Sequence, residues 1–385
     1  MRKVYLDHAA TTPVRPEVLA EMVPYFSEHF GNASSGHQWG RRAREAVDVA
    51  REQVAEFIGA HPDEIIFTSG GTEADNLALR GCLSAMRGKR GGLVTNAAEH
   101  DAVLGTAEEL LHAGHAVTIL GVDQQACVDP EAVRRAVNQD TALVSVMLAN
   151  NEVGSIQPVG EIAGIARESG AFMHTDAVQA AAGLALDVEE LGVDMLSLSA
   201  HKVYGPKGVG ALCVRRGTRL APILTGGGQE LGRRGGTENV PGLVGMGKAC
   251  ELMKRSLTED VPRIARLRDR LRDGILERVP GARCNGHPER RLANNAHFLF
   301  PGALGETVVV ALDEQGVAGS SGSACAAGST EASHVLVAMG VPLDQAYDSL
   351  RLSLGRGTSE QDIEWVLQVL PPIVERVRQA QDGRA

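Results

Sequence analysis

A regular alternation of short apolar runs with longer amphipathic runs begins near residue 60 and constrains the fold more than any other feature of the chain. The apolar runs have the length and β-branched content of buried strands, and several of the runs between them have helical spacing. Because parallel strands need long crossover connections, the alternation predicts an α/β fold with a mostly parallel central sheet. The expected strands are 64–69, 92–96, 115–120, 141–149, 171–176, 194–199 and 210–215. The expected helices include 72–86, 101–114 and 159–169.

The pattern changes near residue 240, where a helical stretch is expected over 240–279 and is followed by mixed strands and helices. The chain is expected to end in an amphipathic helix that Pro371 and Pro372 kink or divide, because proline removes a backbone donor. We therefore predict a large domain and a smaller α+β domain. The large domain is expected over 16–255, and the small domain over 1–15 and 256–385.

Composition excludes several classes of function. Acidic residues outnumber basic ones by 48 to 38, the formal net charge is −10, and basic residues form no long run. This balance argues against direct binding to nucleic acid or to a membrane surface. No apolar run approaches the ~18 residues of a membrane-spanning helix, and the N-terminus lacks the apolar segment of a signal peptide. We therefore expect a soluble, cytoplasmic protein. The six cysteines form no CxxC pair, so we expect no metal site.

Two motifs follow expected strands. In residues 68–76, Gly71 and Thr72 precede a helix whose free N–H groups could cradle a phosphate, although Thr72 with Asp75 also resembles a helix cap. Asp176 lies just past another strand, with Gln179 three residues later. A carboxylate at this edge of the sheet lies where α/β folds bind ligands, but an isolated aspartate is more often a cap.

A third motif places Ser199, His201 and Lys202 after a strand and before a Gly/Pro turn. Such a lysine is a candidate amine nucleophile, whereas a single lysine is by default a surface residue. The conjunction of the three motifs is more specific than any one of them. Pyridoxal 5'-phosphate needs a phosphate cup, an acid opposite its ring nitrogen and a lysine for a Schiff base, and the sequence offers all three.

Several longer motifs then resemble those of the cysteine desulfurases, and most closely the group that feeds iron–sulfur assembly, within the fold-type I pyridoxal phosphate enzymes. The resemblance runs from residue 4 to about residue 370. It implies removal of sulfur from L-cysteine to give L-alanine and an enzyme persulfide, a homodimer, and a protein sulfur acceptor such as an iron–sulfur scaffold. The motifs that carry it include 5–19, 64–79, 149–158, 197–212, 233–242, 320–325 and 351–356.

The same resemblance implies a role for each matching residue. Lys202 matches the Schiff-base lysine, and Asp176 matches the acid at the pyridine nitrogen. His100 matches the histidine that stacks on the ring and moves protons. Further matches are Thr72, Ser199 and His201 for the phosphate, Thr237 for a phosphate contact from the partner subunit, Gln179 for the phenolate oxygen, and Asn151 and Arg351 for the substrate carboxylate.

Cys325 matches the residue that takes up the sulfur. It lies in a stretch rich in Gly, Ser and Ala, which predicts a mobile loop over about 318–332. Cys82, Cys213 and Cys250 lie in apolar contexts and are expected to be buried. The roles of Cys127 and Cys284 stay open.

The sequence argues against a nucleotide site and a metal site, and it leaves some other activities open. Residues 242–249 have P-loop spacing, but Ala249 replaces the required hydroxyl and no strand precedes them. His112 and His115 lack a third metal ligand nearby. A selenocysteine lyase, a sulfur donor for tRNA thiolation and another fold-type I activity remain possible enzymes, and a non-catalytic protein on the same fold is the alternative outside enzymes.

Overall fold

The computed structural model describes residues 2–321 and 332–382. Its central sheet has seven strands in the order β2-β8-β7-β6-β5-β3-β4. Strands β3 to β7 pair in parallel, whereas β8 pairs antiparallel with both β7 and β2. The predicted α/β fold with a mostly parallel sheet is therefore confirmed. The strands are β2 (Ile65–Thr68), β3 (Gly92–Asn96), β4 (Val117–Leu120), β5 (Thr141–Ser145), β6 (Phe172–Asp176), β7 (Met195–Ser199) and β8 (Gly210–Val214).

Helices cover both faces of this sheet. Neighbouring residues on β5 show this, because Leu143 packs into one core with α4 and α5, whereas Val144 packs into another with α3, α7 and α9. Both side chains are fully buried, which explains why the strand sequences are continuously apolar. The helices of this part of the chain are α1 (Pro16–Met22), α2 (Pro24–Ser27), α3 (Gln38–Phe57), α4 (Gly71–Ala85), α5 (Asp101–His112), α6 (Pro130–Ala136), α7 (Val159–Ser169) and α8 (Val188–Leu191).

A second core forms around the chain's C-terminal part. It contains a three-stranded antiparallel sheet in the order β12-β10-β9, and a short parallel pair of β1 with β11. The strands are β1 (Val4–Tyr5), β9 (Arg283–Asn285), β10 (Asn295–Leu299), β11 (Val317–Ala318) and β12 (Ser349–Ser353). The helices that pack into this core, besides α9, are α10 (Gly305–Asp313) and α13 (Glu360–Asp382). Two short helices, α11 (His334–Ala338) and α12 (Leu343–Ala346), pack in a separate cluster with Ala98, Ala126 and Val153. Among the described helices, none is long and apolar enough to cross a membrane.

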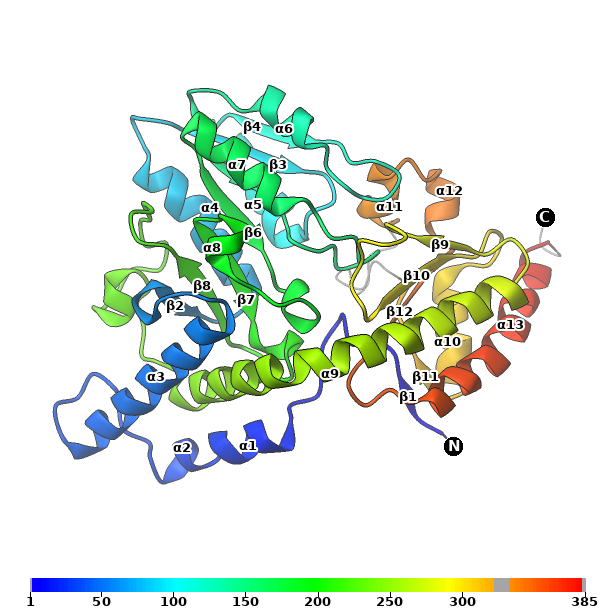
Figure 1. The fold of residues 1–385 in the computed structure, drawn as a ribbon, viewed down its shortest axis with the longest axis horizontal. Helices are drawn as coiled ribbons and strands as arrows, with labels where there is room; N and C mark the ends of the chain where they lie inside the picture. Colours follow the sequence, from blue (N-terminus) through cyan, green and yellow to red (C-terminus); the bar gives the residue numbers. More distant parts are fainter. Residues whose placement is uncertain (1, 322–331, 383–385) are drawn as a thin grey trace.

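One helix connects the two parts. Helix α9 (Val240–Arg278) has 39 residues and is therefore about 58 Å long. Figure 1 shows it running from beside α3 at one end to beside α13 at the other. Its first half packs Leu243 and Met246 into the core of the large sheet, and its second half packs Leu271 and Ile275 into the second core. The expected domain boundary at residue 255 falls inside this helix, and the domain limits stay a prediction.

Pro371 and Pro372 were expected to kink or divide the last helix. They do not divide it, because α13 continues through both, and the kink stays a prediction. A proline at 371 leaves the carbonyl of Leu367 without its usual helical donor. In this structure the Arg278 guanidinium donates to the Leu367 carbonyl at 3.1 Å. A side chain at the end of α9 therefore supplies the hydrogen bond that the proline removes.

Gly210 on β8 packs directly against the backbone of Gly70, at the start of α4. A Cβ at this position would lie 2.5 Å from the carbonyl carbon of Gly70 and 2.7 Å from the carbonyl oxygen of Leu198. We expect Gly210→Ala to lower the free energy of unfolding by about 1–3 kcal/mol, because backbone atoms must move to admit the methyl group. Urea unfolding followed by circular dichroism measures this difference.

Gly164→Ala is the matched control. Gly164 lies inside α7, and a Cβ on it would meet no other atom within 4 Å. Replacing a glycine inside a helix with alanine stabilises a protein by roughly 0.5–1 kcal/mol. Equal unfolding midpoints for Gly210→Ala and wild type would contradict this prediction, because they would show that the backbone around Gly210 admits a methyl group at no cost in stability.

Candidate active site

A cavity of about 230 Å³ lies at the carboxyl edge of the large sheet. Its walls come from segments that follow β2, β3, β5, β6 and β7, together with the N-terminal segment. Most of the residues singled out in the sequence therefore come together. The lining residues are Ala10, Gly71, Thr72, Asp75, His100, Met147, Asn151, Asp176, Val178, Gln179, Ser199, His201 and Lys202.

The start of α4 forms one end of this cavity. Gly71 is the first residue of the helix, and a Cβ on it would lie 2.9 Å from a methyl carbon of Val178. The glycine thus lets the helix N-terminus approach the end of β6 closely. The first N–H groups of a helix have no partner within the helix and attract anions. With the hydroxyls of Thr72 and Ser199 and the His201 ring on the same cavity, this end suits a phosphate.

Lys202 lies in a short 3-10 turn, η3 (Ala200–Lys202), directly after β7. Its ammonium group donates to the carbonyl oxygens of Ala9 and of Ala10, the latter at 2.8 Å. Thr12 holds the same N-terminal segment in place, because its N–H and hydroxyl both donate to the His201 carbonyl. The sequence analysis did not predict that the first residues of the chain would contact this lysine.

Asp176 ends β6 and is 6% exposed. One of its oxygens accepts the N–H of Val178 at 2.8 Å. Burial raises the pKa of Asp176, although the positive charges of His100 and Lys202 and the N–H of Val178 oppose this effect. A protonated ring nitrogen placed in the cavity would favour the carboxylate in the same way. Gln179 lies beside it, and its amide donates to the Ala9 carbonyl at 2.8 Å.

His100 caps the N-terminus of α5. Its Nδ1 accepts the N–H of Ala102 at 3.0 Å, so a neutral ring carries its proton on Nε2. His201 also lines the cavity. Burial, together with the charges of Lys202 and Lys207, lowers the pKa of His201 to about 4. The His201 ring is therefore neutral near pH 7.

A buried polar chain that the sequence did not predict lies behind Asp176. His174 is fully buried, and burial lowers its pKa to about 3. Its ring nitrogens contact the hydroxyls of Ser145 at 2.8 Å and Ser197 at 3.0 Å. An oxygen of Asp75 lies 3.6 Å from His174 Nε2. Burial, followed by the charge of Asp176, raises the pKa of Asp75, so the neutral acid is favoured here.

Glu99 is a second buried acid that sequence reasoning missed. It precedes His100 and is fully buried. Its Oε1 accepts the N–H of Met147 at 2.7 Å and the amide of Asn96 at 2.5 Å. Burial raises the pKa of Glu99 to about 8. A glutamate directly before a histidine gives no pattern from which such burial could be predicted.

Asn151 and Arg351 are in contact, but only Asn151 lines the cavity. Asn151 lines the cavity, and its side-chain oxygen is buried without a hydrogen-bond partner among the described residues. Arg351, on β12, does not line the cavity. Its guanidinium donates to the Asn151 carbonyl at 3.1 Å and to Asp7 at 3.0 Å. Their expected contacts with a substrate carboxylate stay a prediction.

Two expected site residues lie elsewhere. Thr237 is exposed between the short turn η4 (Gln229–Gly232) and α9, and it does not line the cavity. Its expected contact with a phosphate in the partner subunit stays a prediction. Cys325 and most of the expected loop over 318–332 lie outside the described residues.

The remaining sequence interpretations can be checked directly. Cys82, Cys213 and Cys250 are buried as predicted, and burial raises the pKa of Cys82 and Cys250 to about 12. Residues 242–249 lie inside α9, so they form no strand–loop–helix phosphate site. Within the part of the chain that the structure describes, no group of three or more His, Cys, Asp or Glu side chains could hold a metal ion.

The cavity fits pyridoxal 5'-phosphate in chemistry. The phosphate end has a helix N-terminus at which Gly71 leaves no room for a side chain. The Asp176 carboxyl and the Lys202 amine line the same cavity. Asn151 adds a buried amide oxygen without a hydrogen-bond partner among the described residues. The residues would thus hold the phosphate, the ring nitrogen and the aldehyde carbon of the cofactor.

Comparisons with known proteins agree with this chemistry. The family described as Aminotransferase class-V matches residues 4–366. A protein of Methanosarcina thermophila named "Cysteine desulfurase IscS" is 48% identical over 377 residues, which cover 98% of this chain and 93% of that protein.

Solved structures agree as well. A structure described as "NIFS-LIKE PROTEIN" has a TM-score of 0.91 and 36% identity, and covers 97% of this chain and 100% of that chain. A structure described as "SspA in complex with cysteine" has a TM-score of 0.81 and 36% identity, over 91% of this chain and 99% of that one.

The pKa of Glu99 predicts a pH dependence of stability. The folded state keeps a proton on Glu99 up to about pH 8, whereas an exposed glutamate in the unfolded chain loses it near pH 4.5. The stabilisation that the protonated Glu99 gives the folded state is therefore complete below about pH 4.5, and it is lost as the pH rises through about 8. For the cofactor-free protein, we expect the urea midpoint to fall from pH 5 to pH 8, and to fall less for Glu99→Gln.

Asp362→Asn serves as the control. Hydrogen bonds from Ser359 and Arg2 outweigh the burial of Asp362 and lower its pKa, so it does not titrate in this range. This variant should keep the wild-type slope. A Glu99→Gln slope equal to that of wild type would show that Glu99 is ionised in the folded protein.

Proposed function

The chain belongs to the Aminotransferase class-V family and is a pyridoxal phosphate-dependent cysteine desulfurase, and from this premise we propose which residues carry the reaction. The convergence of Lys202, Asp176, His100 and the start of α4 on one cavity supports the assignment most strongly. When bound, the cofactor supplies a ring that withdraws electrons from the substrate Cα.

The binding roles follow from the residues that line the cavity. Gly71, Thr72, Ser199 and His201 hold the phosphate, and Lys202 is the covalent attachment point. Asp176 holds the proton of the ring nitrogen through its carboxylate. Gln179 donates to the phenolate oxygen of the ring. In the homodimer that we propose, Thr237 of each subunit adds a phosphate contact in the other.

The proton movements are assigned to two side chains. The Lys202 amine takes the Cα proton of L-cysteine, because the carbonyls of Ala9 and Ala10 keep this amine beside the cavity. His100 carries a proton on Nε2 when neutral and so can deliver one to the substrate. Asn151 and Arg351 orient the substrate carboxylate, since a guanidinium suits such a group.

Sulfur leaves the substrate through Cys325. Its thiolate forms a bond to the substrate sulfur while the carbon–sulfur bond breaks. The electron pair of the broken bond returns to the carbon skeleton, which takes a proton and leaves as L-alanine. The sulfur stays on Cys325 as a persulfide and passes to a protein acceptor such as an iron–sulfur scaffold. The resemblance of the sequence to the iron–sulfur-assembly group supports this acceptor, and a cytoplasmic location fits the composition.

Exposed apolar side chains support the proposed homodimer. Phe26 and Phe30 near α2, Trp39 on α3 and Leu231 on η4 are each more than half exposed. A large exposed apolar patch often marks a protein interface, and three of these side chains, Phe26, Phe30 and Trp39, come from one short stretch of the chain that contains α2 and the start of α3. Figure 1 shows α1 and α2 on the outside of the molecule, along the first half of α9.

Lys202→Ala tests the attachment point. We expect this variant to lose the visible absorbance of the bound cofactor and to form L-alanine at least about a thousandfold more slowly, because attachment and proton transfer are both removed. Lys254→Ala, a change at a half-exposed lysine on α9, should behave as wild type. A yellow, active Lys202→Ala protein would assign attachment to another residue.

Cys325→Ala tests the sulfur-accepting residue. L-alanine and sulfide are measured from L-cysteine with a reductant present, for the variant and wild type side by side. We expect the variant to keep the cofactor and to bind L-cysteine, but to release sulfide at least about a hundredfold more slowly. Cys127→Ala should keep wild-type activity, because Cys127 does not line the cavity. Normal sulfide release by Cys325→Ala would exclude Cys325 as the nucleophile. Competition between L-cysteine and selenocysteine distinguishes a selenocysteine lyase.

A further inference from the structure

The turn that carries Asn151 is held from outside by an unbroken row of hydrogen bonds. Arg351 donates to the Asn151 carbonyl at 3.1 Å, and the Asn295 amide to the Glu152 carbonyl at 2.9 Å. The next two carbonyls, of Val153 and Gly154, accept from Arg291 at 3.4 Å and from the Leu292 N–H at 2.8 Å. All four donors belong to the C-terminal part of the chain, around β10 and β12.

The other side of the turn is fixed to the large sheet. The Asn150 amide donates to the Ala98 carbonyl at 2.9 Å, and its oxygen accepts the N–H groups of Glu152 and Val153. Gly154 closes the turn with a φ of +80°, and a Cβ there would lie 2.8 Å from the Asn295 Cβ. Asn295 therefore packs directly on the turn whose carbonyl it binds.

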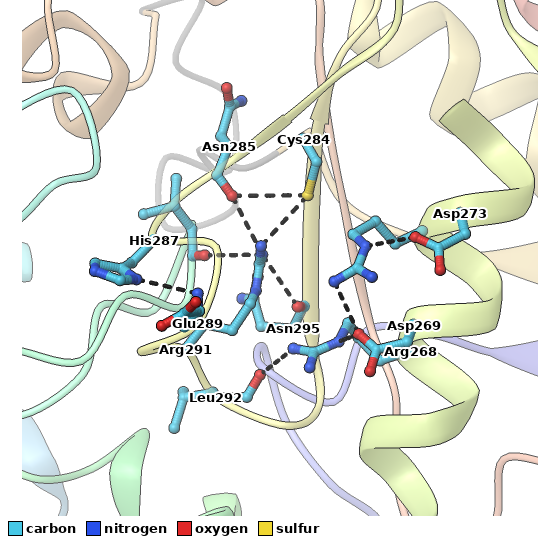
Figure 2. Close-up of polar contacts among 12 residues, drawn as sticks. Arg268, Asp269, Asp273, Cys284, Asn285, His287, Glu289, Arg291, Leu292 and Asn295 are labelled. Atoms are coloured by element: carbon cyan, nitrogen blue, oxygen red, sulfur yellow. Dashed lines mark hydrogen bonds and ion pairs between the residues drawn. The ribbon is translucent and has the colours of Figure 1, made fainter. Parts of the chain in front are cut away.

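Arg291 is unusual among these donors. It is 7% exposed, and Figure 2 shows its guanidinium between Cys284, Asn285 and Asn295. It donates to the carbonyls of Asn285 at 3.2 Å and Asn295 at 3.3 Å, and to the Cys284 sulfur at 3.4 Å. Among the described residues it forms no ion pair with a carboxylate. A buried charge that only carbonyls and a thiol solvate is a costly way to stabilise a fold.

Two atoms of the row add to this cost. Arg291 Nε and the side-chain oxygen of Asn295 are buried without hydrogen-bond partners among the described residues. Each such group costs free energy that an apolar residue would not. Buried polar groups that lower the stability of a protein are expected where function requires a particular geometry.

We infer that Arg291 and Asn295 are positioning residues for substrate binding, which act by fixing the backbone of Asn151. The inference rests on the proposed role of Asn151 in binding the substrate carboxylate. Asn151 lines the cavity, and the position of its side chain depends on the backbone that the row of donors holds. The carboxylate contact persists throughout the reaction, so loosening the turn should weaken binding more than it slows chemistry.

The experiment compares KM for L-cysteine with kcat in the full-length holoenzyme. We expect Arg291→Gln and Asn295→Ala to raise KM about tenfold, to change kcat less than about threefold, and to leave the cofactor absorbance unchanged. Asn295→Ala keeps the Cβ that packs on Gly154, so it tests the row even if Arg291→Gln does not fold.

Arg378→Gln is the matched control. Its guanidinium also donates to two backbone carbonyls in the C-terminal part of the chain, those of Pro301 at 3.0 Å and Pro280 at 2.9 Å, but neither carbonyl belongs to the turn or to the residues that bind it. This variant should lose stability and keep the wild-type KM. An equal rise in KM for Arg378→Gln would overturn the inference, because general loosening would then explain the effect.

A double-mutant cycle with Asn151→Ala separates the two proposals. If Arg291 acts through Asn151, then Arg291→Gln adds little to the KM of Asn151→Ala. Additive effects on KM would overturn the positioning role. An unchanged KM for Asn151→Ala would instead refute the proposed function of Asn151. A third outcome is a raised KM for Asn151→Ala together with a wild-type KM for both Arg291→Gln and Asn295→Ala. This outcome would overturn the positioning role and leave the proposed function of Asn151 intact.

Discussion

Parallel pairing of β3, β5, β6 and β7 is the constraint on which the site depends. Because these strands run in the same direction, the segments that follow them meet at one edge of the sheet. His100, Asn151, Asp176 and Lys202 come from four such segments. A single strand in the opposite direction would remove its residue from the cavity. The two antiparallel pairings at β8 lie beside this group and bring Gly210 against Gly70, at the start of α4.

The electrostatics of the site follow from the burial of its polar groups. Burial raises the pKa values of Asp75, Glu99 and Asp176 and lowers those of His174 and His201. Burial therefore favours the neutral form of each of these groups. For Asp176, the positive charges of His100 and Lys202 and the N–H of Val178 oppose the effect of burial on the pKa. The protonated ring nitrogen of the cofactor would add a further positive charge and so favour the carboxylate.

The sequence predicted much of this from local patterns, and failed where long-range contacts decide. The strand–helix alternation and the motifs around Thr72, Asp176 and Lys202 each depend on a few neighbouring residues. The carbonyls of Ala9 and Ala10 on Lys202, nearly two hundred positions away, leave no local pattern. The same holds for the continuity of α13 through its prolines, because the compensating Arg278 lies on another helix.

The turn at Asn151 shows why a second core is needed beside the large sheet. Asn150 fixes this turn to the sheet, whereas Arg351, Asn295 and Arg291 fix it to β10, β12 and the loop between β9 and β10. Hydrogen bonds have strict distances, so the turn can satisfy both sides only when the two cores dock in one arrangement. Helix α9, which packs into both cores, limits their relative movement. The part of the cavity around Asn151 therefore takes its final shape only when both cores are folded, whereas Asp176 and Ser199 belong to strands of the large sheet itself.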